Sequence, residues 1–263
     1  MGTSSHNPGQ SGHSPLVPSW VDDNNTSVLA APIAPNADPS RFSVPKGNMT
    51  RFAGSGSGNG NGNLRSAASQ YVRSSTGGAR NATARLGSAR SSTAKLVGAI
   101  GAFSSGGASR AQEFLKTYNL VGKRADDALR SITDLICPDG GTTNEGIVRD
   151  AYIDTIAETP ELRTLNFEDL TPDQLMVVLQ GCISRVVLGK LLNDIGNKVL
   201  SIPESLQRIK SLKDRMISFV KGIVGDAFIR LGIQPSSIHQ KDANELTDNV
   251  YEQVYAIFAE ADK

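Results

Sequence analysis

Residues 171–195 read TPDQLMVVLQGCISRVVLGKLLNDI and decide the fold class. Thr171 can cap a helix, Pro172 suits the first helical turn, and Gln174 completes a capping box with the threonine. Apolar residues then follow at the three- and four-residue spacing of a helix stripe. The stripe is formed by Leu175, Leu179, Cys182, Val186, Leu192, Ile195 and Val199. This stretch therefore predicts a long helix that buries one face.

The rest of residues 111–263 repeats this pattern. Two further helix-start signals, each a capping residue followed three positions later by glutamate, precede apolar stripes. The two stripes lie within residues 201–227 and 242–258. Two earlier helical segments are predicted at residues 124–137 and 144–157. No stretch has the regular alternation of a strand. We therefore predict an all-α fold in which 111–263 form an antiparallel helical bundle of five or six helices.

Residues 1–63 have a different composition. Glycine, proline, serine and asparagine account for 34 of these 63 residues. Such a segment cannot bury enough apolar surface to offset the entropy lost on ordering. We predict a long disordered N-terminal tail over 1–63, with a flexible linker in the glycine-rich run at 54–62.

A few apolar residues interrupt this tail. Trp20, the only tryptophan of the chain, ends the peptide Pro15-Leu16-Val17-Pro18-Ser19-Trp20, and Phe42 and Phe52 each follow an arginine. Because such residues have little core to join, they suit docking to a partner protein. The alternative is that they are stray apolar side chains in a solvated tail.

Residues 64–110 form a third region, which is rich in small residues and is predicted to contain two helices. Ala94, Gly98 and Ala102 are spaced four residues apart and so share one face of a helix. Small residues at this spacing let a second helix approach closely. We expect this face to pack against another helix, from the bundle or from a partner protein.

Charge is unevenly distributed along the chain, although the net charge is only +1. Residues 41–110 carry ten bases and no acid, whereas residues 111–263 have a net charge of −6. An acid-free basic segment suits a nucleic-acid backbone, but bases five residues apart are rotated by about 140° around a helix and do not line one face. Solvation, contact with the acidic bundle and an anionic membrane surface are the alternatives. The bases to which these alternatives apply are Arg73, Arg80, Arg85, Arg90 and Lys95.

No catalytic constellation is evident in the sequence. The three histidines have no metal-ligand partner at the usual spacing, and two cysteines make neither a disulfide framework nor a metal site. Cys137 is predicted at a helix C-terminus, where the helix dipole does not favour a thiolate, and Cys182 in a buried stripe. We therefore predict a protein that is not an enzyme and has no metal or cofactor.

Export and membrane signals are also absent from the sequence. No apolar run approaches the length of about 18 residues that a membrane-spanning helix needs, and the N-terminus lacks the features of a secretory signal. We expect a cytoplasmic protein that does not enter a membrane.

The chain begins Met1-Gly2-Thr3-Ser4-Ser5, and the small second residue favours removal of the initiator methionine. The pKa of an α-amino group is about 7.7–8.0, against about 10.4 for lysine, so the Gly2 amine would be the most available amine nucleophile. Myristoylation would need serine or threonine where His6 stands. The sequence therefore predicts an available amine on a mobile tether.

Unusual motifs occur along the chain from one end to the other. They are Met1-Gly2-Thr3-Ser4-Ser5, Pro15-Leu16-Val17-Pro18-Ser19-Trp20-Val21, Arg51-Phe52, Gln70-Tyr71-Val72-Arg73, Gly77-Gly78-Ala79-Arg80, Cys137-Pro138-Asp139-Gly140-Gly141-Thr142 and Leu191-Leu192-Asn193-Asp194-Ile195-Gly196. In this order, they resemble the QatB family, the B component of the bacterial Qat anti-phage defence system. The resemblance extends over essentially the whole chain.

The resemblance implies three companions: an ATPase, a TatD-type DNase, and QatC, a protein similar to 7-cyano-7-deazaguanine synthase. It further implies that the chain binds the QatC-type partner, which joins a deazaguanine to a protein amino terminus. On this chain the acceptor would be Gly2, with Thr3, Ser4 and Ser5 following it into the partner's active site. The alternative is a nucleic-acid-binding adaptor that uses residues 41–110 to bring the DNase to phage DNA.

Overall fold

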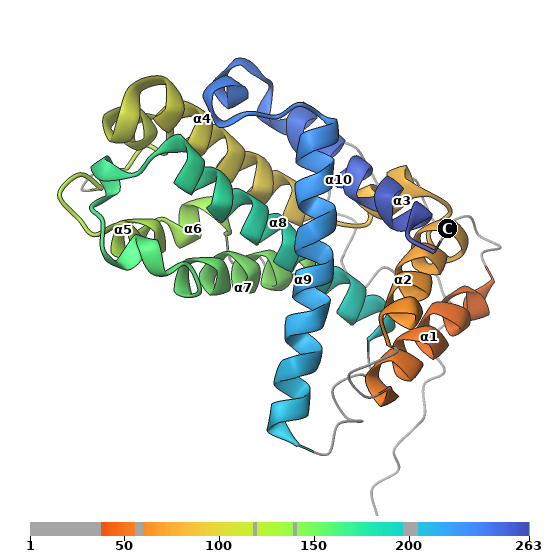
Figure 1. The fold of residues 1–263 in the computed structure, drawn as a ribbon. Helices are drawn as coiled ribbons and strands as arrows, with labels where there is room; N and C mark the ends of the chain where they lie inside the picture. The colour runs from red at the N-terminus through yellow and green to blue at the C-terminus, as the bar shows by residue number, and fades with distance from the viewer. Residues whose placement is uncertain (1–37, 56–59, 118–119, 139–140, 197–204, 263) are drawn as a thin grey trace, which may run out of the picture.

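The computed structural model describes five parts of the chain, and all the regular structure in them is helical (Figure 1). These parts are residues 38–55, 60–117, 120–138, 141–196 and 205–262. The α-helices are α1 (Ser43–Gly54), α2 (Asn61–Gln70), α3 (Ala79–Ala84), α4 (Ser88–Phe114), α5 (Ala125–Ser131), α6 (Thr133–Ile136), α7 (Thr143–Ala157), α8 (Pro172–Ile195), α9 (Leu206–Arg230) and α10 (Ala243–Glu260). The shorter turns include η1 (Pro39–Phe42), the π-helical η2 (Tyr71–Ser75) and η5 (Pro235–Gln240). The prediction of an all-α fold is confirmed.

The helix α8 lies at the centre of the molecule, packed against α4, α7 and α9. Thr171 Oγ1 accepts a hydrogen bond from the Gln174 backbone N–H, and Gln174 Oε1 accepts one from the Thr171 backbone N–H, as the sequence predicts. Length and composition alone would allow α8 to cross a membrane, but 67% of its most apolar window is buried inside the fold. Its apolar character is explained by its central position in the core.

The last helices close the bundle. The helix α10 packs against α3, α4 and α9, and its start at Asp242 is confirmed by hydrogen bonds from the backbone N–H groups of Asn244 and Glu245 to the Asp242 carboxylate. The helix predicted at residues 124–137 is broken into α5 and α6 at Ile132. The start predicted for the penultimate helix, at residues 201–204, lies outside the described residues, and α9 begins after Ser205.

The predicted tail boundary at residue 63 is wrong. The helix α1 and the beginning of α2 belong to the folded body, and Met49 and Phe52 are fully buried. The reason is an apolar stripe at Pro45, Met49 and Phe52, spaced at i, i+4 and i+7, within a segment whose average composition is polar. Residues 1–37 lie outside the described residues.

The predicted divisions at residues 63 and 110 do not separate independent cores either. One continuous cluster of buried residues extends from Met49 in α1 to Phe258 in α10. The helix α4 crosses the boundary at residue 110, and the α3–α4 connection turns at Gly87, whose φ is +53°. The folded body from residue 38 onward therefore shares a single hydrophobic core.

Candidate functional site

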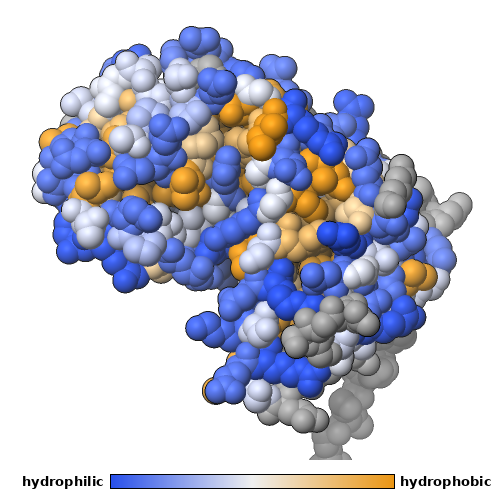
Figure 2. Space-filling model, viewed as in Figure 1, coloured by the Kyte–Doolittle hydropathy of each residue, from blue (hydrophilic) through white to orange (hydrophobic). Residues whose placement is uncertain are grey.

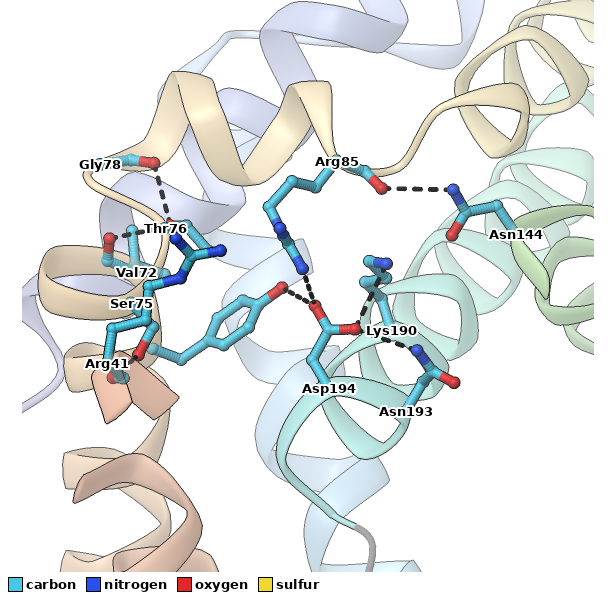
Figure 3. A network of polar contacts seen from close by, with 11 residues as sticks. Arg41, Val72, Ser75, Thr76, Gly78, Arg85, Asn144, Lys190, Asn193 and Asp194 are labelled. Carbon is cyan, nitrogen blue, oxygen red and sulfur yellow. Dashed lines mark hydrogen bonds and ion pairs between the residues drawn. The ribbon is translucent and has the colours of Figure 1, made fainter. Parts of the chain in front are cut away.

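A buried polar cluster around Asp194 joins the N-terminal helices to the bundle (Figure 3). The Asp194 carboxylate accepts hydrogen bonds from the Tyr71 hydroxyl at 2.9 Å and from the Arg85 guanidinium at 3.0 Å. It also forms an ion pair with Lys190 Nζ at 3.3 Å, one helical turn earlier in α8. The cluster thus connects η2, the residue that follows α3, and the C-terminal end of α8.

The charges in this cluster are largely withdrawn from water. The side chains of Asp194 and Lys190 are 6% and 9% exposed, and that of Arg85 is 23% exposed. Burial alone would raise the pKa of Asp194. The Lys190 charge and the hydrogen bonds from Arg85 and Asn193 reverse this effect, so the pKa of Asp194 lies below its ordinary value. The carboxylate is therefore charged at neutral pH and holds two cations together.

The first described residues pack directly onto this cluster. The Phe42 ring lies 6.2 Å from the Tyr71 ring, between centroids, and the guanidinium groups of Arg41 and Arg85 lie 5.1 and 5.5 Å from the Phe42 centroid. Ser75 Oγ donates a hydrogen bond to the Arg41 carbonyl oxygen at 2.7 Å (Figure 3). These contacts fix the point at which residues 1–37 join the fold.

Three buried polar atoms near this junction have no hydrogen-bond partner among the described residues. They are Nε of Arg41, Nε of Arg85 and the hydroxyl of Tyr255. The Tyr255 ring lies 6.4 Å from the Tyr71 ring. Burial raises the pKa of the Tyr255 hydroxyl, which is protonated at neutral pH. The junction therefore has an excess of donor groups and of positive charge.

The bases predicted to contact either nucleic acid or the acidic bundle are divided by the structure. Arg73 pairs with Asp262 at 2.7 Å, Arg85 pairs with Asp194, and Arg90 pairs with Asp248. Arg80 and Lys95 are exposed. Contact with the acidic bundle is therefore confirmed for three of the five, and these three do not form a free track for phosphates.

The small-residue face is covered by its own helix. Ala94 is buried, Gly98 and Ala102 are half-buried, and a Cβ atom at Gly98 would overlap the ring of Phe114. Gly106 and Gly107 interrupt the helical backbone of α4, and the φ of Gly107 is +68°, so the last turns of α4 fold back. The predicted close approach occurs, and the approaching segment is the end of the same helix. The predicted contact of this face with a partner stays a prediction.

This packing predicts that a large side chain at position 98 destabilises the fold. Gly98→Leu should lower the free energy of unfolding by about 1–3 kcal/mol, because the new side chain must displace Phe114. Gly222→Ala is the matched control, since a Cβ there meets nothing within 4 Å. That control should raise stability by up to about 1 kcal/mol through helix propensity. Urea denaturation measures both effects, and an unchanged midpoint for Gly98→Leu would show that the α4 turn does not pack as described.

The predicted docking residues have different environments. Phe52 is fully buried beneath Arg215, so it has no surface to offer a partner and its docking prediction is wrong. Phe42 is half-buried against the core, and its docking role stays a prediction. Their apolar character is used inside the fold. Trp20, Gly2 and the small residues 3–5 lie outside the described residues, so their predicted roles stay predictions.

The two cysteines are core residues. Cys137 ends α6, and burial raises the pKa of its thiol to about 11. Cys182 is buried in α8, and burial raises the pKa of its thiol further. Within the described parts of the chain, no group of three histidine, cysteine or acidic side chains is placed to hold a metal ion.

Sequence reasoning missed the Asp194 cluster. Tyr71, Arg85 and Asp194 come from segments more than a hundred residues apart at the extremes, and only the fold brings them together. One signal was available: Lys190 and Asp194 are an i, i+4 pair of opposite charge within an otherwise apolar helix.

Comparison with known proteins gives one family match. A family model described as QatB, Qat anti-phage system associated protein QatB, matches residues 77–258. That range extends from the start of α3 through most of α10 and includes Arg85, Lys190 and Asp194. No curated protein and no solved structure matches the chain.

Proposed function

Because the chain belongs to the QatB family and so takes part in Qat anti-phage defence, we propose that it is a non-enzymatic acceptor protein within that system. It binds the QatC-type partner, a homologue of 7-cyano-7-deazaguanine synthase, and presents its Gly2 amine for conjugation to a deazaguanine. The Qat ATPase and the TatD-type DNase act with this pair. The protein carries out these steps in the cytoplasm and has no need of a cofactor of its own.

The observation that supports this proposal is the separation between the anchor and the terminus. The described fold begins at Asp38, and within a few residues the chain is held by Phe42 against Tyr71 and Arg85. Residues 2–37 are the 36 positions between this anchor and the terminus. If they behave as their composition predicts, their r.m.s. span is about 30–36 Å by flexible-chain scaling. Gly2 can then reach a partner's active site while the bundle stays docked.

The chemistry uses the distinctive properties of the Gly2 amine. The partner activates the carboxylate of a deazaguanine with ATP, and the neutral Gly2 amine attacks the activated carbonyl carbon. An amide bond forms, the ATP-derived group leaves, and the amine gives up a proton. Gly2 has no side chain, and Thr3 and Ser4 are small, so this terminus suits a channel sized for ammonia.

The test is substitution of Gly2 in a cell that carries the complete system. Gly2→Pro makes the amine secondary and hindered, and Gly2→Trp retains the initiator methionine. We expect both variants to lose phage protection while keeping their complex with the QatC-type partner. Arg80→Ala and Lys95→Ala change exposed bases of the folded body and serve as matched controls, which should still protect.

Normal protection by both Gly2 variants would overturn the proposal. The nucleic-acid adaptor would then be the better account, and it makes an opposite prediction for the controls. In that case Arg80→Ala and Lys95→Ala would lose both protection and salt-dependent DNA binding. The pairing of Arg73, Arg85 and Arg90 with carboxylates gives the adaptor little support.

A further inference from the structure

A groove between α2 and the N-terminal half of α9 combines an apolar floor with a basic rim. Its volume is about 690 Å³, and Leu64 and Phe219 form its floor. The Phe219 ring stacks on Phe258 with centroids 5.7 Å apart, so this floor is continuous with the core. Arg65 of α2 and Lys210 of α9 stand at the rim.

The two rim bases are available to a ligand. Arg65 and Lys210 are exposed, and neither forms an ion pair or hydrogen bond with another described residue. Arg215 is held in place, since it donates to Asn61 Oδ1 at 2.8 Å and lies over the Phe52 ring at 4.8 Å. Among the described residues that line the groove, Asp214 is the only acid. Figure 2 shows hydrophilic residues over the lower half of α9, with apolar residues beside its upper half.

We propose that this groove holds residues 15–23 of the same chain, Pro15-Leu16-Val17-Pro18-Ser19-Trp20-Val21-Asp22-Asp23. This peptide matches the groove in chemistry: an apolar part that ends at Trp20 meets the floor, and the two acids that follow face Arg65 and Lys210. Residues 1–37 contain no lysine or arginine, and Asp22 and Asp23 are their only acids. The prolines favour an extended peptide, which lowers the entropy lost on binding.

The length of chain between the peptide and the fold is sufficient. Residues 24–37 can span at most about 46–50 Å when extended. From Asp38 the chain passes through η1 and the 12 residues of α1, a helix about 18 Å long, before the groove begins at Asn61. Because that span is more than twice the length of α1, the peptide is long enough to reach the groove.

Docking of this peptide would determine where the terminus is offered. Only residues 2–14 would remain free, with an r.m.s. span of about 18–22 Å by flexible-chain scaling. The Gly2 amine would then stay near α2 and α9, and the partner's active site would lie over this face. This consequence rests on the proposed function, whereas the contact between peptide and groove does not.

The single tryptophan provides a direct test in the isolated full-length protein. We expect native Trp20 to emit at a shorter wavelength than in urea and to be protected from acrylamide quenching. Arg65→Glu combined with Lys210→Glu should release it, with roughly a tenfold fall in the ratio of docked to free peptide, because each exposed ion pair contributes up to about a fivefold factor. The matched control is Lys213→Glu, an exposed base on α9 that does not line the groove.

Charge reversal of the peptide tests the pairing itself. Asp22→Lys with Asp23→Lys should release Trp20, and combination with the two groove substitutions should restore its protection. The proposal is wrong if native Trp20 is quenched as readily as in urea, or if the groove substitutions leave its emission unchanged. The proposal is also wrong if Arg65→Glu with Lys210→Glu abolishes salt-dependent DNA binding while Trp20 is exposed both before and after the substitutions. The groove would then be a nucleic-acid surface. None of these readings depends on conjugation of Gly2, so a failure here is distinguishable from a failure of the proposed function.

Discussion

Replacement of Asp194 by alanine is expected to lower the free energy of unfolding by about 3–5 kcal/mol, the usual loss when one partner of a buried ion pair is removed. The substitution leaves Arg85 and Lys190 facing each other without a counter-charge, and it leaves the buried Tyr71 hydroxyl without its acceptor. Chemical denaturation followed by circular dichroism measures the loss. Asp248→Asn is the matched control, because the Asp248 side chain is 40% exposed and its pair with Arg90 contributes at most about 1 kcal/mol.

The same cluster predicts a pH dependence. The pKa of Asp194 is lowered in the folded state, so its contribution to stability is present in full above the unfolded-state pKa of about 3.9 and is lost as the pH falls through the folded-state pKa. Asp194→Asn lacks this contribution. The difference in unfolding free energy between the wild type and Asp194→Asn should therefore be constant near neutral pH and shrink below about pH 4. A difference that grows on acidification would contradict the assignment of the charged form.

Phe52→Ala should have an effect of similar size, about 3–5 kcal/mol, because it empties a fully buried site. The ring lies under the Arg215 guanidinium and within the core cluster that begins at Met49. Val44→Ala, on the same helix but 58% exposed, is the control and should change stability by no more than about 0.5 kcal/mol. A small effect of Phe52→Ala on the free energy of unfolding would show that α1 does not belong to the folded core.

Truncation can separate the contribution of residues 2–37 to stability from that of α1, measured by the same denaturation experiment. A chain that lacks residues 2–37 should keep nearly all its stability, apart from the contribution of the docked peptide. A chain that lacks residues 2–55 should lose cooperative unfolding, because α1 and its buried Met49 and Phe52 are removed from the core.

Local sequence signals predicted the helix starts of the bundle well. The capping box at Thr171 and the aspartate cap at Asp242 act within three residues, so no tertiary information was needed. The same signals missed α1, because its stripe is short and interrupted by Gly47 and Asn48, and the average composition of residues 1–63 concealed it. Burial of Asn48 and the pairing of its side chain with Arg51 at 2.6 Å become visible only in the fold.

Long-range polar contacts were less accessible to sequence reasoning than the helix starts. Ion pairs such as Arg73 with Asp262 join residues almost two hundred positions apart, and periodicity carries no information about such distances. The small-residue face around Gly98 was predicted to admit a close neighbour, which is correct. That neighbour is Phe114 of the same helix, because Gly106 and Gly107 let the chain reverse.

Under the proposed function, the folded body carries Gly2 as an acceptor for its synthase-like partner. The most direct test is mass spectrometry of the N-terminal peptide from cells that are resisting phage, with and without the QatC-type protein. We expect that Met1 is removed and that the mass of one deazaguanine acyl group is added at Gly2 only when the partner is present, with every lysine unmodified. An unmodified Gly2 in cells that are demonstrably protected would contradict it.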